Sequence, residues 1–334
     1  MSTVTLSPAQ RLEIVSLREP HSTPTFADDV RSGLSAVPKR LPSKYFYDEL
    51  GSALFDAITL LPEYYLTRAE TEILRDCGWE IVRALGNPVE FIELGSGSAI
   101  KTRILIEEAL RVQRTLRYSP IDISTEALRS SALSLVERYS ALTITAYAAD
   151  YFSVLRDGAL KRPGRVLAMF MGSNIGNYEP EQARELLRAV ASSLKKSDGI
   201  LVGMDLKKEP RVLERAYDDP TGVTAAFNKN LLARINRELD GEFDLDDFRH
   251  IATYDARSGC VRSYLQAERS HSVRIAAIDA NVEFIKGERI HTESSYKFSE
   301  ADIASLAAAC GLKAERSWTD ARKRFSVTLF VRTD

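Results

Sequence analysis

The sequence predicts an α/β protein that combines a doubly wound, Rossmann-like parallel sheet with an inserted α+β domain. Strand-like and helix-like segments alternate from residue 89 to residue 204. Such alternation implies parallel strands joined by right-handed helical crossovers. It stops between residues 208 and 297 and resumes with a helix that begins at Ser299. The first strand of the series also ends in a glycine loop, as in sheets that form a nucleotide-sized pocket.

Ahead of the alternation, prolines separate three helical segments. Apolar residues at helical spacing predict helices over residues 26–34, 51–61 and 68–85. Pro38 and Pro42 separate the first two helices, and Pro62 ends the second, because proline cannot continue a helix. The polar stretch over residues 1–25 is expected to be partly mobile.

The alternating region supplies the strands and helices of the predicted parallel sheet. Residues 166–171 are apolar without interruption, as expected of a strand buried on both faces. Leu186, Leu187, Val190 and Leu194 form one apolar stripe, which predicts a helix packed on the sheet. The full set is strands over residues 89–94, 117–121, 142–148, 166–171 and 199–204, and helices over residues 101–113, 124–138 and 180–194.

The inserted region mixes a helix with short strands. The pattern predicts a helix over 227–239, an acidic turn over 244–247, strands over 261–267, 273–278 and 289–297, and a hairpin partner at 282–284. Ser299 and Asp302 then predict the N-terminal cap of a helix, and residues 325–331 predict the last strand. We therefore expect a ligand-binding sheet domain over residues 69–207 plus 298–334. Residues 1–68 plus 208–297 are expected to form a substrate-binding domain.

Composition favours a cytoplasmic enzyme that acts on a small molecule. The 334 residues carry a net charge of −2, so no basic field favours nucleic acid or an anionic membrane as a partner. No apolar run reaches the roughly 18 residues that a membrane span needs, and no signal peptide is visible at the start of the chain. The 3 cysteines are widely separated, which fits a reducing compartment. The 4 histidines show no metal-ligand spacing, so no metal is expected.

The loop after strand 89–94 carries the first functional motif. Its glycines, Gly95 and Gly97, follow an acidic residue, Glu93. No third glycine and no Gly-Lys-Ser/Thr follow, which argues against a P-loop and weakens a dinucleotide-binding interpretation. An acidic residue before the glycines suits S-adenosylmethionine, because its sulfonium is cationic. A simple glycine turn is the alternative.

Two other predicted strands end in aspartates. Asp122 can accept hydrogen bonds from both ribose hydroxyls of a nucleoside, and Asp150 can accept one from an adenine amine. Tyr151 or Phe152 is then expected to lie against the adenine ring. Helix capping or a solvated turn is the alternative for each aspartate. With the glycine loop, these acceptors predict an S-adenosylmethionine site.

The loop over residues 172–177 is where we expect the transferred methyl group to meet its acceptor. Its small residues allow close approach, and two asparagines offer donors and acceptors. The alternative is a plain turn in which Asn177 caps the next helix. Methyl transfer requires an aligned nucleophile, and an amine must first lose its proton. Tyr47 and Tyr64 are candidates to hold that amine, with ordinary core packing as the alternative.

Seven runs carry a resemblance to a known family. The chain resembles the histidine-specific N-α-methyltransferases of ergothioneine biosynthesis from about residue 30 to residue 331. The runs are LPSKYFYD at 41–48, LPEYYLTR at 61–68, ELGSG at 93–97, GSNIGN at 172–177, AYDD at 216–219, GVTAAFN at 222–228 and TESSYKF at 292–298. The resemblance implies a class I methyltransferase domain and the trimethylation of the L-histidine α-amine, which yields hercynine.

The resemblance also implies roles for particular residues. The cofactor site would comprise Gly95, Lys101, Asp122, Asp150 and Tyr151. The substrate would contact Asn177 and Tyr217 through its carboxylate, Tyr47 and Tyr64 through its amine, the Gly172 backbone, and Glu293 and Ser295 through its imidazole.

Ser263 departs from the pattern of this family, which has methionine against the imidazole at this position. A smaller side chain could admit a larger ring, so tryptophan or a prenylated tryptophan is the alternative substrate. A non-catalytic S-adenosylmethionine or amino-acid sensor is an alternative of another class. A nucleic-acid or protein methyltransferase would need a basic groove or an open cleft, which the charge balance does not suggest.

Overall fold

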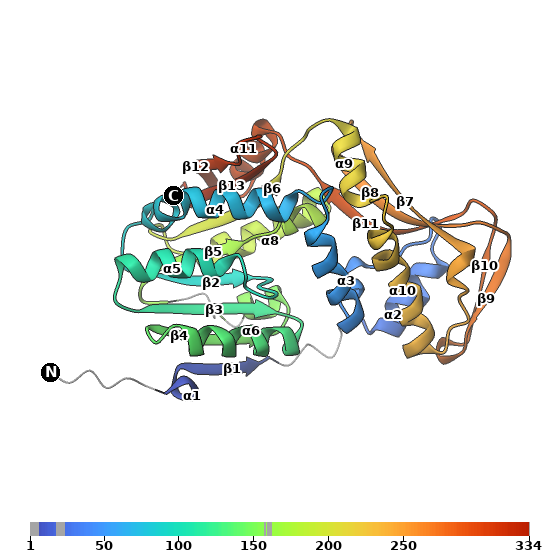
Figure 1. The fold of residues 1–334 in the computed structure, drawn as a ribbon, viewed down its shortest axis with the longest axis horizontal. Helices are drawn as coiled ribbons and strands as arrows, with labels where there is room; N and C mark the ends of the chain where they lie inside the picture. The colour runs from blue at the N-terminus through green and yellow to red at the C-terminus, as the bar shows by residue number, and fades with distance from the viewer. Residues whose placement is uncertain (1–6, 18–23, 157, 159–161, 334) are drawn as a thin grey trace. The chain divides into compact units, whose positions relative to one another are not determined.

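The computed structural model describes residues 7–17, 24–156, 158 and 162–333 (Figure 1). Their contacts divide the chain into two compact units. The first unit comprises residues 1–20, 66–206 and 298–334, and the second comprises residues 21–65 and 207–297.

The first unit is built on one eight-stranded sheet, which confirms the predicted Rossmann-like fold class. Its strand order is β1-β4-β3-β2-β5-β6-β13-β12. All neighbours from β1 to β6 pair in parallel, whereas β13 runs antiparallel to both β6 and β12. The strands are β1 (Leu12–Ser16), β2 (Val89–Leu94), β3 (Leu116–Asp122), β4 (Leu142–Ala148), β5 (Arg165–Phe170), β6 (Gly199–Asp205), β12 (Leu312–Thr319) and β13 (Phe325–Arg332).

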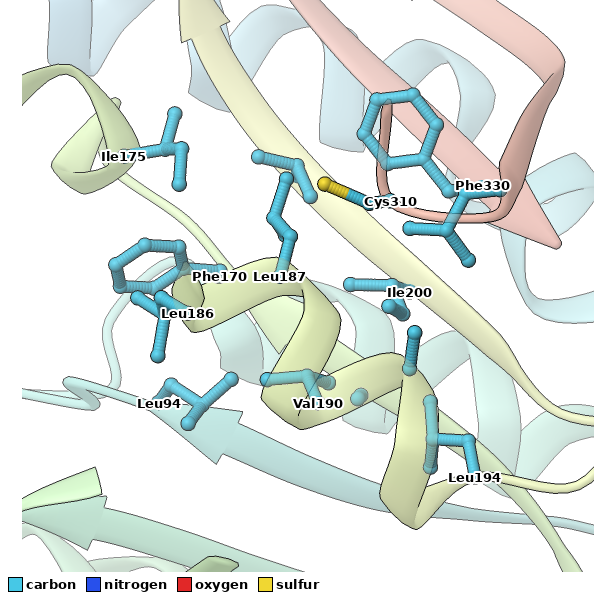
Figure 2. Close-up of a cluster of buried hydrophobic side chains, with 14 of the residues drawn as sticks. Leu94, Phe170, Ile175, Leu186, Leu187, Val190, Leu194, Ile200, Cys310 and Phe330 are labelled. Carbon is cyan, nitrogen blue, oxygen red and sulfur yellow. The ribbon is translucent and has the colours of Figure 1, made fainter. Parts of the chain in front are cut away.

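Helices pack on this sheet and bury its apolar side chains. The predicted stripe on α8 is confirmed: Leu186, Leu187, Val190 and Leu194 are at most 4% exposed. Figure 2 shows this stripe beside Phe330 and other core residues of the sheet. The helices of the first unit are α1 (Pro8–Arg11), α4 (Leu66–Arg83), α5 (Thr102–Val112), α6 (Thr125–Arg138), α7 (Tyr151–Arg156), η2 (Asn174–Asn177), α8 (Pro180–Ser193) and α11 (Glu300–Ala309).

The strand register brings the candidate loops of the first unit to one edge of the sheet. Leu94 of β2 lies opposite Ile121 of β3, and Glu93 lies opposite Met169 of β5. The three strands therefore end side by side, because parallel strands share the same direction. As a result, the loops that follow Leu94, Asp122 and Phe170 start from neighbouring positions.

The second unit contains a three-stranded antiparallel sheet in the order β11-β8-β7 and a separate β9–β10 hairpin. Helix α10 packs against α3 and against β7 and β8. The strands are β7 (Phe248–Asp255), β8 (Cys260–Ala267), β9 (His271–Ile275), β10 (Ala280–Phe284) and β11 (Arg289–Tyr296). The helices are α2 (Phe26–Ser35), η1 (Ser43–Phe46), α3 (Glu49–Leu60), α9 (Pro210–Tyr217), α10 (Val223–Leu239), η3 (Leu245–Asp247) and η4 (Ala276–Ile278).

Several elements were not predicted, among them the strands β1, β7 and β12 and the helices α1, α7 and α9. Strand β12 mostly exposes the side chains between Leu312 and Trp318, because it lies at the sheet edge, so it lacks an apolar pattern. Strand β1 pairs in parallel with β4. Residues 12–16 therefore lie in the sheet unit rather than in the substrate-binding domain, to which the sequence analysis assigned residues 1–68.

Within the described ranges, no helix has the length and apolar character needed to cross a bilayer. The same part of the chain holds no group of three or more His, Cys, Asp or Glu side chains that could bind a metal ion.

Arg11 provides a test of how the N-terminal segment is anchored. Its guanidinium is buried and donates hydrogen bonds to the carbonyls of Val136 (2.7 Å), Tyr139 (2.8 Å) and Leu142 (2.9 Å). We expect Arg11→Ala to lower the free energy of unfolding by about 2–3 kcal/mol, because charged hydrogen bonds to the end of α6 are lost. Urea denaturation measures this change. The control Arg111→Ala removes only an exposed ion pair, and an equal loss there would contradict the expectation.

Candidate active site

The glycine loop after β2 has a backbone that only glycine adopts easily. Gly95 and Gly97 have φ angles of +74° and +48°. A Cβ atom on Gly95 would lie 2.5 Å from the Tyr151 hydroxyl oxygen. The Gly95 amide also donates a 2.8 Å hydrogen bond to the carbonyl of Ile121, which holds the loop against the end of β3. The loop is therefore held in place and has no side chain at these two positions.

Asp122 faces this loop from the end of β3. Its Oδ2 accepts a 2.9 Å hydrogen bond from the Gly97 amide, and its Oδ1 accepts a 2.9 Å bond from the Ser124 amide. Each carboxylate oxygen can accept two hydrogen bonds, so each retains capacity for a ligand hydroxyl. The position thus fits the acceptor of ribose hydroxyls that the sequence analysis predicted.

Asp150 and Tyr151 lie at the start of α7. Asp150 accepts a 3.1 Å hydrogen bond from the Ser153 amide, and the Ser153 hydroxyl donates to its other oxygen. The carboxylate therefore caps α7, which is the contact that the alternative interpretation describes. The Tyr151 ring meets Phe170 edge-on at 5.8 Å. Contact of either residue with adenine stays a prediction.

Glu70 joins three parts of the first unit and was missed by the sequence analysis. Its side chain on α4 is buried, and its Oε1 accepts a 2.8 Å hydrogen bond from the Gly172 amide. Its Oε2 forms an ion pair with Lys101, at the start of α5. Gly203 on β6 leaves space for this carboxylate, since a Cβ there would lie 2.3 Å from Oε1. The sequence places this glutamate on the apolar face of a predicted helix, and that unusual position could have identified Glu70 as a candidate.

Glu93 corrects one expectation about the glycine motif. The acidic residue before the glycines was expected to face the ligand, but Glu93 is 3% exposed. It accepts a 2.6 Å hydrogen bond from the Thr102 hydroxyl and another from the Tyr118 hydroxyl. Burial raises the pKa of Glu93 to about 7. This carboxyl group connects β2, β3 and α5 inside the core. It therefore stabilises the glycine loop through the elements on either side of that loop.

The loop after β5 forms a short 3-10 helix, η2. Gly172 has a φ angle of +76°, and Ser173 also adopts a left-handed backbone. The Ser173 hydroxyl accepts a 2.9 Å hydrogen bond from the Asp205 amide, which anchors the loop to β6. Asn177 is the last residue of η2 and is half-buried. The alternative that Asn177 caps the next helix is wrong, because Glu179 is the N-terminal cap of α8.

In the second unit, aromatic rings connect the candidate tyrosines. Tyr47 and Tyr64 both meet Phe55 edge-on, at centroid distances of 5.6 Å and 6.0 Å. The Tyr64 ring also lies 6.3 Å from that of Tyr217. Tyr47 is 39% exposed, whereas Tyr64 is 8% exposed. The structure thus places these three tyrosines in one aromatic cluster together with Phe55.

A polar triangle lies at the Tyr217 end of this cluster. The Lys297 ammonium donates hydrogen bonds of 2.8 Å to the hydroxyls of Tyr217 and Ser295, and these hydroxyls lie 2.8 Å apart. All three residues are at most 7% exposed. The sequence analysis assigned no role to Lys297. Side chains alternate between the two faces of a strand, so Lys297 lies on the same face as Glu293 and Ser295. This spacing in the sequence could have identified Lys297 as a candidate site residue.

Glu293 and Ser263 lie opposite each other on β11 and β8. Ser263 is 1% exposed, and its hydroxyl has no hydrogen-bond partner in the described part of the chain. Burial raises the pKa of Glu293 to about 7, and the charge of Lys297 opposes this shift. No described residue donates a hydrogen bond to the Glu293 carboxylate, which keeps some exposed surface. A half-buried carboxylate thus lies beside an unsatisfied hydroxyl.

The structure brings the predicted site residues together in two groups. One group follows the ends of β2, β3, β4 and β5 in the first unit, and the other comprises residues of β8, β11 and the aromatic cluster in the second. The joint role of Asn177 and Tyr217 in binding a substrate carboxylate stays a prediction. The first group is Gly95, Lys101, Asp122, Asp150, Tyr151, Gly172 and Asn177, and the second is Tyr47, Tyr64, Tyr217, Ser263, Glu293 and Ser295.

The raised pKa of Glu293 predicts how stability depends on pH. The folded-state pKa, about 7, exceeds the ordinary value of 4.5, so the folded chain holds this proton more tightly. The resulting stabilisation is present below about pH 4.5 and is lost as the pH rises through 7. As the pH rises from 5 to 8, we expect the free energy of unfolding of wild type to fall by about 2 kcal/mol relative to that of Glu293→Gln.

Urea denaturation at several pH values measures this difference. Glu283→Gln changes an exposed glutamate in the same unit and serves as the control, because its pH dependence should match that of wild type. A constant difference between Glu293→Gln and wild type from pH 5 to pH 8 would show that Glu293 has an ordinary pKa.

Comparison with known proteins identifies the family. Residues 26–332 match the model of a family described as histidine-specific methyltransferase, SAM-dependent. The chain is 43% identical to the histidine N-alpha-methyltransferase of Mycolicibacterium smegmatis, over 91% of this chain and 94% of that protein. The corresponding protein of Mycobacterium tuberculosis is 43% identical over 90% and 93%. The L-tryptophan methyltransferase of Psilocybe serbica is 27% identical over 91% and 92%. The chain therefore belongs to the histidine-specific, S-adenosylmethionine-dependent methyltransferases.

Proposed function

We propose that this methyltransferase transfers three methyl groups to the α-amine of L-histidine and so produces hercynine, in ergothioneine biosynthesis. One observation carries the proposal. Glu293 and Ser295 occupy the same face of β11, with a half-buried carboxylate two residues from a buried hydroxyl. The family and the two mycobacterial relatives at 43% identity support the same substrate.

The pair offers groups complementary to the two nitrogens of an imidazole ring. A neutral imidazole has one N–H donor and one bare nitrogen acceptor. The Glu293 carboxylate can accept from the N–H, and the Ser295 hydroxyl can donate to the other nitrogen. A ring without these groups would leave buried polar atoms unpaired, which is costly and therefore selective.

The first unit fits S-adenosylmethionine. The cofactor supplies an electrophilic methyl group on its sulfonium when bound. Asp122 retains acceptor capacity for ribose hydroxyls, and Gly95 presents bare backbone beside it. Lys101 is held by Glu70 next to the Gly172 backbone. We assign Asp150 and Tyr151 to the adenine side, as the resemblance implies.

The amino-acid backbone would be held by residues from both groups. We assign the carboxylate to Asn177 and Tyr217, the amine to Tyr47 and Tyr64, and a backbone contact to Gly172. A phenol with an ordinary pKa near 10 is a weak base at neutral pH, so the tyrosines orient the amine rather than deprotonate it. Methylation stops after three transfers because a quaternary nitrogen has no lone pair. Aromatic rings also suit the charged product.

Asp122→Asn tests the cofactor assignment. An amide has a single acceptor oxygen, so it cannot satisfy the Gly97 and Ser124 amides together with two ribose hydroxyls. We expect the affinity for S-adenosylhomocysteine to fall by about tenfold or more, measured by isothermal titration calorimetry. Glu126→Gln, at an exposed position of the neighbouring helix, is the control. Unchanged affinity of Asp122→Asn would refute the assignment.

Ser263 favours a second candidate substrate. A small side chain lies opposite Glu293, where the family resemblance implies methionine, and its hydroxyl is unsatisfied. This leaves room for a larger ring. One relative, from Psilocybe serbica, is an L-tryptophan methyltransferase. Tryptophan, or a prenylated tryptophan, is therefore the alternative.

Mass spectrometry of reactions with each amino acid decides between the two substrates. We expect L-histidine to gain three methyl groups and L-tryptophan to remain unmodified. Ser263→Met should keep activity on histidine, since Glu293 and Ser295 are intact. Ser258→Met, at an exposed turn, is the matched control. Methylation of tryptophan with histidine untouched would replace the proposed function by the alternative.

A further inference from the structure

Lys297 is a charged group placed where few lysines are found. It is 2% exposed, and its ammonium lies 4.5 Å from the centroid of the Tyr217 ring. It also donates to the hydroxyls of Tyr217 and Ser295, each at 2.8 Å. Burying an ammonium is expensive unless hydrogen bonds compensate it. We therefore expect the buried ammonium to have a function other than packing.

The hydrogen bonds of the triangle determine which atoms can bind a ligand. An ammonium can only donate, so both hydroxyl oxygens act as acceptors toward Lys297. The two hydroxyls also lie 2.8 Å apart, and only one of them can donate to the other. One hydroxyl proton is therefore used inside the triangle. The second proton remains to be donated outside it.

We propose that Lys297 is a positioning residue, which orients the hydroxyls of Tyr217 and Ser295 so that Tyr217 donates to Ser295 and Ser295 donates to the amino-acid substrate. The inference rests on the proposed function, in which Ser295 must donate to the bare imidazole nitrogen. Without the ammonium, the Ser295 hydroxyl could turn and act as an acceptor, and it would no longer distinguish a bare nitrogen from an N–H.

The positive charge of Lys297 also affects the ionisation of Glu293, in the direction that the proposal requires. It lowers the pKa of Glu293 against the effect of burial, and so favours the carboxylate that accepts the imidazole N–H. The same ammonium that orients the Ser295 hydroxyl therefore also favours the ionised, hydrogen-bond-accepting form of Glu293. This pattern matches a single neutral tautomer of the substrate ring.

The test compares Lys297→Met with Lys297→Arg in the full-length protein. Calorimetry measures the dissociation constants of L-histidine and, separately, of S-adenosylhomocysteine. We expect Lys297→Met to weaken histidine binding by about tenfold or more, with S-adenosylhomocysteine binding within about twofold of wild type. Lys297→Arg keeps the charge and the donors, so it should recover part of the histidine affinity.

Lys39→Met is the matched control, because Lys39 is another largely buried lysine of the second unit, paired with Glu288. It should change thermal stability but not histidine affinity. Should Lys297→Met fail to fold, Lys297→Gln replaces it, and failure of both to fold would assign a purely structural role and overturn the inference.

The remaining outcomes separate this inference from the proposed function. A folded Lys297→Met that binds histidine as tightly as wild type, or that loses both ligands equally, overturns the inference alone. Wild-type protein that neither binds nor methylates histidine overturns the proposed function and, with it, this role of Lys297.

Discussion

The cofactor side of the first unit depends on the buried carboxylate of Glu70. A carboxylate removed from water is strongly unfavourable unless it is paired and hydrogen-bonded. Glu70 meets this requirement with two partners from distant parts of the chain, the Gly172 amide and the Lys101 ammonium. One side chain therefore fixes α4, the start of α5 and the loop after β5. The glycine loop and Asp122 then lie on a rigid edge, as a methyl-transfer site requires.

In the second unit, a single strand positions the polar side chains of the candidate site. Alternate residues of β11 and the residue that follows it place Glu293, Ser295 and Lys297 on one face. The same face carries a carboxylate, a hydroxyl and an ammonium; Ser295 and Lys297 are buried, and Glu293 is half-buried. Under the proposed function, selectivity comes from a few polar groups in a mostly apolar setting, where each unmatched polar atom of the substrate or the protein is costly.

Local patterns predicted the fold class because its signals are local. Apolar runs such as residues 166–171 and the stripe on α8 reveal buried strands and helices directly. Strand β12 was missed because an edge strand needs no apolar pattern. The role of Glu93 was mistaken because the sequence shows that it precedes the glycine loop, but not that Thr102 and Tyr118 enclose it.

The candidate site was only partly accessible to the same reasoning. Glycines and aspartates at the ends of predicted strands can be recognised from their position in the sequence. The candidate residues around Gly95 and Asp122 could therefore be named from the sequence alone. Glu70 and Gly172 are 102 residues apart, and Lys297 and Tyr217 are 80 residues apart. Contacts over such separations are created by tertiary packing, and no window of sequence contains them.

The position of β1 has a consequence for the protein's behaviour in concentrated solution. This short strand pairs with β4 from Ile144 to Ala148, and so covers most of a backbone edge that would otherwise be open. An open edge beside a buried strand is a template for pairing with a second molecule. Glu13 and Ser16, the more exposed residues of β1, make the new edge short and polar. Because β1 covers this edge, we expect a chain shortened past residue 16 to pair with a second molecule through β4.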